Sequence, residues 1–297
     1  SPTSFEEVFN VKKKRILALF LAAVSCLSLA VSASAANTVA RKATDFRDYD
    51  RTAWYAEAVS AAVDNGLLYG KSSTTLDPNG DMTRAELAAI INRSFGCYKA
   101  ADISQYKDVS KNKWYYKDVA LAVQMGTYNG RSSSTMAPDS PITRQEAMTV
   151  AARALELDYD SYSKTDLSTF SDRSEISNWA LPYVRAMVGA DYIHGRGKVL
   201  APQDNITRAE FAQIFANIIK SYIAVKGEYA KDHDGNLLVR CADVTLKDMT
   251  IKGDLIIGCG AADGKVTLDN VTVTGRLLVW GGGTKAVYCN NGTQMPE

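Results

Sequence analysis

Apolar residues recur at helical spacing in three similar stretches of the chain, each about 60 residues long. In the first stretch, a helix with one apolar face is predicted to end near Gly66, and a second begins at Thr83. Polar loops rich in Gly, Ser and Pro, such as "GKSSTTLDPNG", lie between the helices. Each stretch therefore predicts a helix-loop-helix unit. The apolar faces in the first unit consist of Trp54, Ala58, Val59, Ala62 and Val63, and of Leu87, Ile90 and Ile91.

The three stretches are repeats of one motif. An aromatic residue stands two positions before an Asp in each, a Trp follows, and a Pro stands five positions before a Thr. One helical pair cannot bury its apolar stripe alone, so we expect the three repeats, 45–100, 105–160 and 169–225, to share one compact core. The aspartates are Asp48, Asp108 and Asp172, and the tryptophans are Trp54, Trp114 and Trp179.

A five-residue core, "MTRAE", "ITRQE" or "ITRAE", opens the second helix of each repeat. Thr followed three residues later by Glu, directly before an apolar helical run, predicts a capping box. Folding alone therefore accounts for the Thr and the Glu of the motif. The three pairs are Thr83 and Glu86, Thr143 and Glu146, and Thr207 and Glu210.

The Arg of the motif needs another explanation, because a cation at the first helical position costs on the order of 0.3–1 kcal/mol against the helix dipole. A helix N-terminus with an adjacent Arg can bind a carboxylate or a phosphate. A second cation follows the loop glycine of each repeat, and together with the Trp these groups favour a groove for an acidic sugar. The alternative is that each Arg pairs with the Asp of a neighbouring repeat, and both hold if the Asp orients the Arg. The arginines are Arg84, Arg144 and Arg208, and the glycine–cation pairs are Gly70 and Lys71, Gly130 and Arg131, and Gly195 and Arg196.

The threefold pattern of aromatic-x-Asp, Trp, glycine loop, Pro and "ITRAE" resembles the S-layer homology domain over about residues 45–223. The resemblance implies a mainly α-helical, pseudo-threefold bundle with one helix from each repeat at its centre. It also implies grooves between repeats that bind secondary cell-wall polysaccharide, often through a pyruvylated sugar, or peptidoglycan in some relatives. The ligand arginine of the family maps onto Arg84, Arg144 and Arg208, and its aspartate onto Asp48, Asp108 and Asp172.

This chain departs from the family pattern in its loops and in its second motif. Leu76, Met136 or Leu200, together with Ser, replaces the usual loop aromatic and glycine, and Gln145 stands where Ala is usual. The third loop is one residue shorter and has an added Gly197. How many of the three grooves bind therefore stays open.

The pattern changes to β after Tyr222, and residues 228–297 are predicted to form an all-β, parallel solenoid-like segment. "VTLKDMTIKGDLIIGCG" aligns with "VTLDNVTVTGRLLVWGG" at an offset of 22, which indicates two solenoid coils. Two coils would leave an edge unpaired. Either the chain continues in a longer protein, the edge pairs with another chain, or residues 283–297 cap it. The stretch "KDHDGN", which contains His233 and Asp234, is expected to be a turn.

The N-terminus predicts export. Three lysines and an arginine precede a 15-residue apolar run and an A-x-A site, which is the order of a secretory signal peptide over residues 11–35. A membrane anchor is the alternative, but the run is short of the ~20 residues that a bilayer needs. We expect translation to start at Val11, with residues 1–10 as an upstream extension, and no membrane association after cleavage.

Neither a metal site nor a cofactor is expected, because the chain has two histidines and no C-x-x-C pair. A disulfide among Cys241, Cys259 and Cys289 is compatible with export. The formal net charge of +1 gives no electrostatic argument for nucleic acid.

The leading hypothesis is a non-enzymatic anchor that holds a secreted protein to the cell wall, where copies of the chain could assemble in a surface layer. An anchored polysaccharide-acting enzyme with an incomplete catalytic solenoid is one alternative, although only scattered carboxylates are found there. A peptidoglycan-binding envelope tether is another. The scattered residues are Asp243, Asp248, Asp254 and Asp269.

Overall fold

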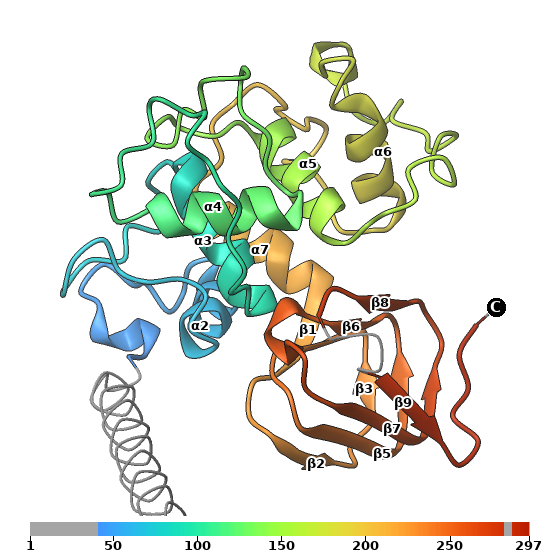
Figure 1. Ribbon diagram of the computed structural model, residues 1–297. Helices are drawn as coiled ribbons and strands as arrows, with labels where there is room; N and C mark the ends of the chain where they lie inside the picture. Colours follow the sequence, from blue (N-terminus) through green and yellow to red (C-terminus); the bar gives the residue numbers. More distant parts are fainter. Residues whose placement is uncertain (1–40, 282–286, 297) are drawn as a thin grey trace, which may run out of the picture. The chain divides into compact units, whose positions relative to one another are not determined.

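The computed structural model describes residues 41–281 and 287–296 (Figure 1). The predicted extension at residues 1–10 and signal peptide at residues 11–35 lie outside these residues. The described chain begins with helices and continues into β-strands, as the repeat pattern and the later alternation predict.

Each of the three repeats contributes two α-helices, so the predicted helix-loop-helix units are confirmed. Every helix in the described residues is too short or too polar to cross a membrane. Short 3-10 turns lie at Ala43–Asp45, Arg173–Glu175 and Cys259–Ala261. The α-helices are α2 (Ala56–Asp64) and α3 (Arg84–Phe95), α4 (Tyr116–Met125) and α5 (Arg144–Ala154), and α6 (Leu181–Gly189) and α7 (Arg208–Ile218).

The prediction that Trp54 belongs to the apolar face of the first helix was wrong. Helix α2 begins at Ala56, after Trp54, whose side chain is 64% exposed. Val59 and Val63 of α2 are buried as expected. The Trp shares their spacing in the sequence, but the turn that precedes the helix directs its ring outward, away from the core.

The motif helices α3, α5 and α7 all begin with the predicted capping box. The hydroxyl of Thr83 accepts a hydrogen bond from the N–H of Glu86, and the Glu86 carboxylate accepts one from the N–H of Thr83. The same reciprocal pair is present in α5 and in α7. These caps satisfy N–H groups that the first helical turn leaves without a partner.

Backbone hydrogen bonds link each repeat to the next, and the third repeat to the first. The N–H of Ile142 donates to the carbonyl of Met82, that of Ile206 to Ile142, and that of Met82 to Ile206, at 2.9–3.0 Å. All three side chains are fully buried. Helix α3 packs against α4, α5 against α6, and α7 against α2. The repeats therefore depend on one another for a common core.

Parallel strands form a solenoid of about three coils. One sheet has the order β1-β4-β6-β8, and the other has the order β2-β5-β7-β9 with β3 also paired to β5. The strands are β1 (Ile219–Ile223), β2 (Gly227–Tyr229), β3 (His233–Asp234), β4 (Asn236–Val239), β5 (Val244–Lys252), β6 (Leu255–Ile257), β7 (Val266–Val273), β8 (Leu277–Val279) and β9 (Val287–Asn290).

The predicted register of 22 residues is confirmed, because Val244 lies beside Val266 and Leu255 beside Leu277. The prediction of only two coils was too low. An earlier coil, β2 to β4, pairs with the next one at a shorter offset, as Leu237 beside Leu255 shows, so the 22-residue repeat does not extend to it.

The prediction of a turn at His233 and Asp234 was wrong. These residues form β3, which pairs in parallel with Ile251 and Lys252 of β5. The turn comes one residue later, at Gly235, whose φ of 101° favours glycine.

The solenoid donates hydrogen bonds to the last turns of the three motif helices. Asn236 donates to the carbonyl of Ile218 in α7, Arg240 to Arg93 in α3, and the Trp280 indole to Ala154 in α5. These contacts supply donors to carbonyls in the last turn of each helix, where intrahelical donors run out, although the Arg93 carbonyl also accepts from the N–H of Gly96. The chain also passes directly from α7 into β1. The solenoid is therefore packed against the C-terminal ends of α3, α5 and α7.

We expect Asn236→Ala to lower the free energy of unfolding by about 2–4 kcal/mol. The buried amide of Asn236 also donates to the Tyr192 hydroxyl and accepts from the N–H of Asp254, so its removal leaves several buried groups unpaired. Urea unfolding measures the change. Lys252→Ala, at an exposed ion pair on β5, is the matched control and should change stability by less than about 1 kcal/mol. Equal losses in both variants would contradict the role of Asn236.

Candidate functional site

The motif arginines are buried and reach from one repeat into the next. Arg84, Arg144 and Arg208 are 6%, 4% and 3% exposed. Their Nε atoms donate to backbone carbonyls in the loop of the next repeat, with the third repeat reaching back to the first. The acceptors are Met136 for Arg84 at 3.0 Å, Leu200 for Arg144 at 2.8 Å and Leu76 for Arg208 at 2.9 Å.

Each guanidinium also forms an ion pair with the capping glutamate of the repeat that it enters. The second oxygen of the same carboxylate accepts from the N–H of the capping Thr, so one Glu joins a helix start to a neighbouring repeat. The pairs are Arg84 with Glu146 at 3.3 Å, Arg144 with Glu210 at 3.1 Å and Arg208 with Glu86 at 3.3 Å. This arrangement resolves the apparent cost of a cation at the helix start, because the guanidinium lies among the oxygens of another repeat.

The motif aspartates hold the loops that receive the arginines. Asp48 accepts hydrogen bonds from the N–H groups of Leu76 and Asp77 at 2.8 and 2.7 Å. Asp108 and Asp172 bind the equivalent N–H groups in the second and third repeats. The alternative that each Arg forms an ion pair in a neighbouring repeat was therefore right, but the partner is the capping Glu and not the motif Asp. The Asp fixes the loop backbone, and the carbonyl of that loop receives the Arg.

The cations that follow the loop glycines converge on the same glutamates. Lys71 lies 2.5 Å from Glu86, Arg131 lies 3.3 Å from Glu146, and Arg196 lies 2.7 Å from Glu210. We call each set of buried arginine, glutamate and loop cation a charge cluster: cluster 1 is Arg208, Glu86 and Lys71, cluster 2 is Arg84, Glu146 and Arg131, and cluster 3 is Arg144, Glu210 and Arg196.

The clusters differ in charge. Clusters 1 and 2 each combine two cations with one carboxylate. In cluster 3, Asp204 also binds Arg196, at 2.8 Å, and supplies a second carboxylate. The aligned positions in the first two repeats are Gly80 and Ser140.

The loop glycines are required by the motif aromatics. A Cβ added to Gly70 would lie 2.4 Å from the ring of Phe46, and one added to Gly130 would lie 2.4 Å from Tyr106. A Cβ added to Gly195 would lie 2.7 Å from the ring of Phe170, and Gly195 has a φ of 74°. The glycines therefore bring each loop close to its aromatic residue. The cation that follows each glycine lies within reach of the capping glutamate.

The motif tryptophans lie on the surface, in contrast to the buried motif arginines. Trp54, Trp114 and Trp179 are 64%, 59% and 51% exposed, and the rings of Trp54 and Trp114 meet those of Tyr55 and Tyr115 edge to face. A large, exposed aromatic ring in the same position of each repeat offers an apolar platform, which the core does not require.

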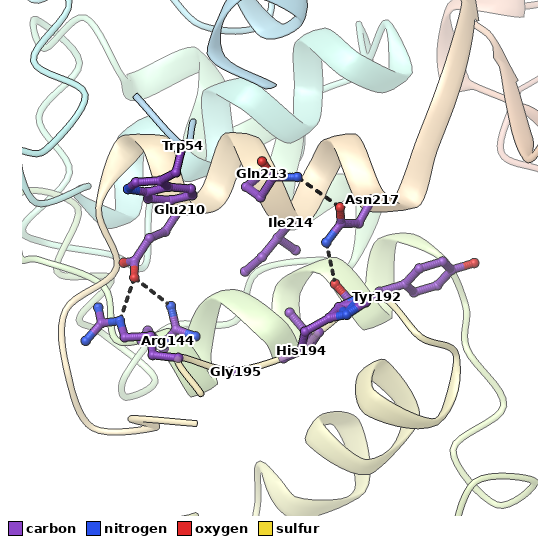
Figure 2. Close-up of a pocket in the computed structure, with 11 residues that line it drawn as sticks. Trp54, Arg144, Tyr192, His194, Gly195, Glu210, Gln213, Ile214 and Asn217 are labelled. Carbon is purple, nitrogen blue, oxygen red and sulfur yellow. Dashed lines mark hydrogen bonds and ion pairs between the residues drawn. The ribbon is translucent and has the colours of Figure 1, made fainter. Parts of the chain in front are cut away.

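One Trp and one charge cluster line a shared pocket of about 610 Å³ (Figure 2). Trp54 comes from the first repeat and Arg144 from the second. Figure 2 shows the Glu210 carboxylate directed toward the guanidinium groups at one end of the pocket. The third repeat supplies the remaining lining residues: Tyr192, Ile193, His194, Gly195, Arg196, Glu210, Gln213, Ile214 and Asn217.

A chain of hydrogen bonds lines another part of this pocket. Gln213 donates to Asn217 at 3.0 Å, and Asn217 donates to the carbonyl of Tyr192 at 3.2 Å (Figure 2). Sequence reasoning missed these two residues, because they occupy ordinary polar positions of α7. Their spacing of four residues on one helix face was the available signal.

Burial and ion pairing set the charge states of cluster 3. Burial lowers the pKa of Arg144, while Glu210 opposes that shift. Burial alone would raise the pKa of Glu210, but hydrogen bonds from Arg196 and from the N–H of Thr207 outweigh it and lower the pKa. The cluster therefore holds a charged carboxylate between two guanidinium groups.

Three of the scattered solenoid carboxylates accept hydrogen bonds from neighbouring coils. Asp254 accepts from the side chain of Arg276 at 2.7 Å, and Asp248 accepts from Asn270 at 2.8 Å. Asp269 accepts from Asn291. These bonds connect consecutive coils and give the three carboxylates a structural role.

Comparisons with known proteins identify the repeats. The model of the S-layer homology domain matches residues 45–88, 105–148 and 169–212. The chain therefore carries three tandem S-layer homology domains, which together with its surface-layer relatives indicate a secreted protein attached at the cell surface.

Relatives include both surface-layer proteins and enzymes. The chain is 34% identical to the surface-layer 125 kDa protein of Lysinibacillus sphaericus, over 65% of this chain and 16% of the relative. It is 30% identical to a cellulosome-anchoring protein of Acetivibrio thermocellus, over 48% of this chain and 33% of the relative. It is 27% identical to an endoglucanase of a Bacillus strain, over 69% of this chain and 22% of the relative. The chain thus matches 16–33% of the length of these relatives.

We expect Glu210→Gln to reduce the acid sensitivity of folding. A carboxyl whose folded pKa is lowered stabilises the folded chain above its unfolded pKa, and this contribution is lost as the pH falls through the folded pKa. The pKa of a Glu in the unfolded chain is near 4.5, so the contribution of Glu210 to stability is lost at pH values below 4.5. Gln keeps an acceptor for the N–H of Thr207, and the variant therefore isolates the charge.

Urea midpoints of both chains, measured from about pH 6 down to about pH 3, test this expectation. The parent chain should lose its advantage over the variant as the pH falls. A constant difference between the two chains across that range would contradict a charged, ion-paired Glu210.

Proposed function

We propose that the three repeats form a pseudo-threefold bundle whose grooves bind secondary cell-wall polysaccharide and so anchor the exported chain to the wall. The pocket between Trp54 and cluster 3 carries the proposal. An exposed indole opposite guanidinium groups and amides supplies a flat apolar surface for a sugar ring and donors for its oxygens.

The cyclic contacts between repeats support three related grooves. Because α2 packs on α7, α4 on α3 and α6 on α5, Trp114 would serve the groove of cluster 1 and Trp179 that of cluster 2. The surplus cation of clusters 1 and 2 favours an acidic sugar substituent there, such as a pyruvyl carboxylate. In cluster 3, Asp204 neutralises that surplus.

In this proposal the motif arginines and aspartates act as positioning residues. The buried guanidinium groups hold the loops and the capping glutamates, while the exposed Trp and the half-exposed loop cations meet the polymer. The relatives named as a surface-layer protein and a cellulosome-anchoring protein support an anchoring role for these domains. The chain itself is proposed to be non-enzymatic, with the solenoid as an attached structural segment.

A peptidoglycan-binding tether is the competing function, and the same experiment separates the two. The chain beginning at Ala36 is sedimented with Gram-positive wall sacculi before and after acid removal of their secondary polymers. Binding that is lost on stripping supports the polysaccharide, and binding that survives it would point to peptidoglycan.

We expect Trp54→Ala to weaken wall binding at least about tenfold, or ~1.4 kcal/mol, because it removes the apolar platform without disturbing the core. Tyr288→Ala, which removes an exposed aromatic residue from β9, is the matched control and should bind as the parent chain does. The full set of Trp54→Ala, Trp114→Ala and Trp179→Ala shows which grooves contribute. Undiminished binding in the triple variant would contradict the proposed platform.

A further inference from the structure

Two cysteines from distant parts of the chain face each other where the solenoid meets the repeats. Cys97 follows helix α3, and Cys259 lies in the 3-10 turn after β6. Their Sγ atoms are 3.0 Å apart, although the residues are 162 positions apart in sequence. A disulfide bond requires the sulfurs to approach to about 2 Å, so the two Sγ atoms must close by about 1 Å.

Close backbone contacts hold the two cysteines in this position. A Cβ added to Gly258 would lie 2.6 Å from the carbonyl oxygen of Phe95, and one added to Gly96 would lie 2.9 Å from the Cα of Gly260. Glycine beside each cysteine therefore lets the solenoid corner approach the end of α3. The Trp280 ring packs edge to face on Phe95, with centroids 6.3 Å apart, and fixes the same contact.

The pair is accessible to a small reagent. Both side chains are partly exposed, and both line a cavity of about 140 Å³ together with Tyr98, Lys99 and Gln124. Buried structural cysteines are inert, whereas thiols that open onto such a cavity can exchange with small disulfides.

We propose that Cys97 and Cys259 are a modification site at which a low-molecular-weight disulfide forms an intramolecular disulfide that locks the solenoid to the repeats. An exported chain meets an environment in which such bonds form and persist. This pairing differs from those expected from the sequence among Cys241, Cys259 and Cys289. It is independent of the proposed polysaccharide binding.

The reaction proceeds by two thiol–disulfide exchanges. The Cys259 thiolate attacks one sulfur of the small disulfide, forms a mixed disulfide and releases one small thiolate. Cys97 then loses its proton to solvent, attacks the Cys259 sulfur and releases the second small thiolate. The two protein thiols are oxidised by two electrons in total, and the small disulfide is reduced to two thiols.

The environment of the pair favours Cys259 as the first nucleophile. The hydrogen bond from the Cys97 thiol lowers the pKa of Cys259, although burial opposes that shift. The same hydrogen bond, together with burial, raises the pKa of Cys97.

The other two described cysteines provide controls. Cys241 lies 3.9 Å from the carbonyl oxygen of Ile223, and Cys289 is exposed on β9. Cys241→Ser/Cys289→Ser should leave the reactive pair intact, whereas Cys259→Ser removes it.

The test treats the full chain with oxidised glutathione, blocks the remaining thiols with N-ethylmaleimide and maps the peptides by mass spectrometry. We expect a cross-linked species that joins the Cys97 and Cys259 peptides in the parent chain and in Cys241→Ser/Cys289→Ser. Because the bond closes a long loop, the midpoint of thermal unfolding should rise on oxidation by on the order of 5 °C or more. Cys259→Ser should show no rise.

The parent peptide map decides the outcome even if Cys259→Ser folds poorly. Free maleimide-labelled Cys97 and Cys259, or glutathione retained on either residue without a cross-link, would overturn the proposal. A cross-link between Cys259 and Cys241 or Cys289 would also overturn it.

Discussion

The fold of the repeats depends on a buried arginine that crosses from each repeat into the next. Its guanidinium donates to a loop carbonyl and pairs with the glutamate that caps the next motif helix. A buried charge is costly unless ion pairing and hydrogen bonds compensate it. Three such arginines, closed in a cycle with three backbone hydrogen bonds, make the position of each repeat conditional on the other two.

This constraint also separates the residues that position the proposed site from those that would contact a ligand. The carboxylate that caps the helix is the same one that receives the buried arginine and the half-exposed loop cation. A ligand that approached the cluster from outside would meet the loop cation and the Trp before it met Arg144. In this chain the pocket beside cluster 3 is therefore built by residues of low exposure, while the proposed ligand-binding residues Trp54 and Arg196 are more exposed. The solenoid extends the same scaffold, since it donates to the ends of all three motif helices.

Local patterns predicted much of this architecture. The capping boxes and the 22-residue register of Val244 and Val266 follow from spacing alone, and both are confirmed. The partner of each arginine could not be predicted in this way. Glu146 appears in the sequence only as a cap, and its second oxygen acquires a role when another repeat approaches it. The exposed position of Trp54 depends on where α2 begins, and helical spacing does not determine that boundary. The proximity of Cys97 to Cys259 arises from docking between separate segments, which periodicity does not encode.

A double-mutant cycle on Arg144 and Glu210 tests the central interaction most directly. Unfolding free energies would be measured for the parent, Arg144→Met, Glu210→Gln and the double variant. If the buried ion pair joins the repeats, the two effects should be non-additive by at least about 1 kcal/mol, since both single changes remove the same contact between Arg144 and Glu210. Additive effects, within about 0.3–0.5 kcal/mol, would contradict the account.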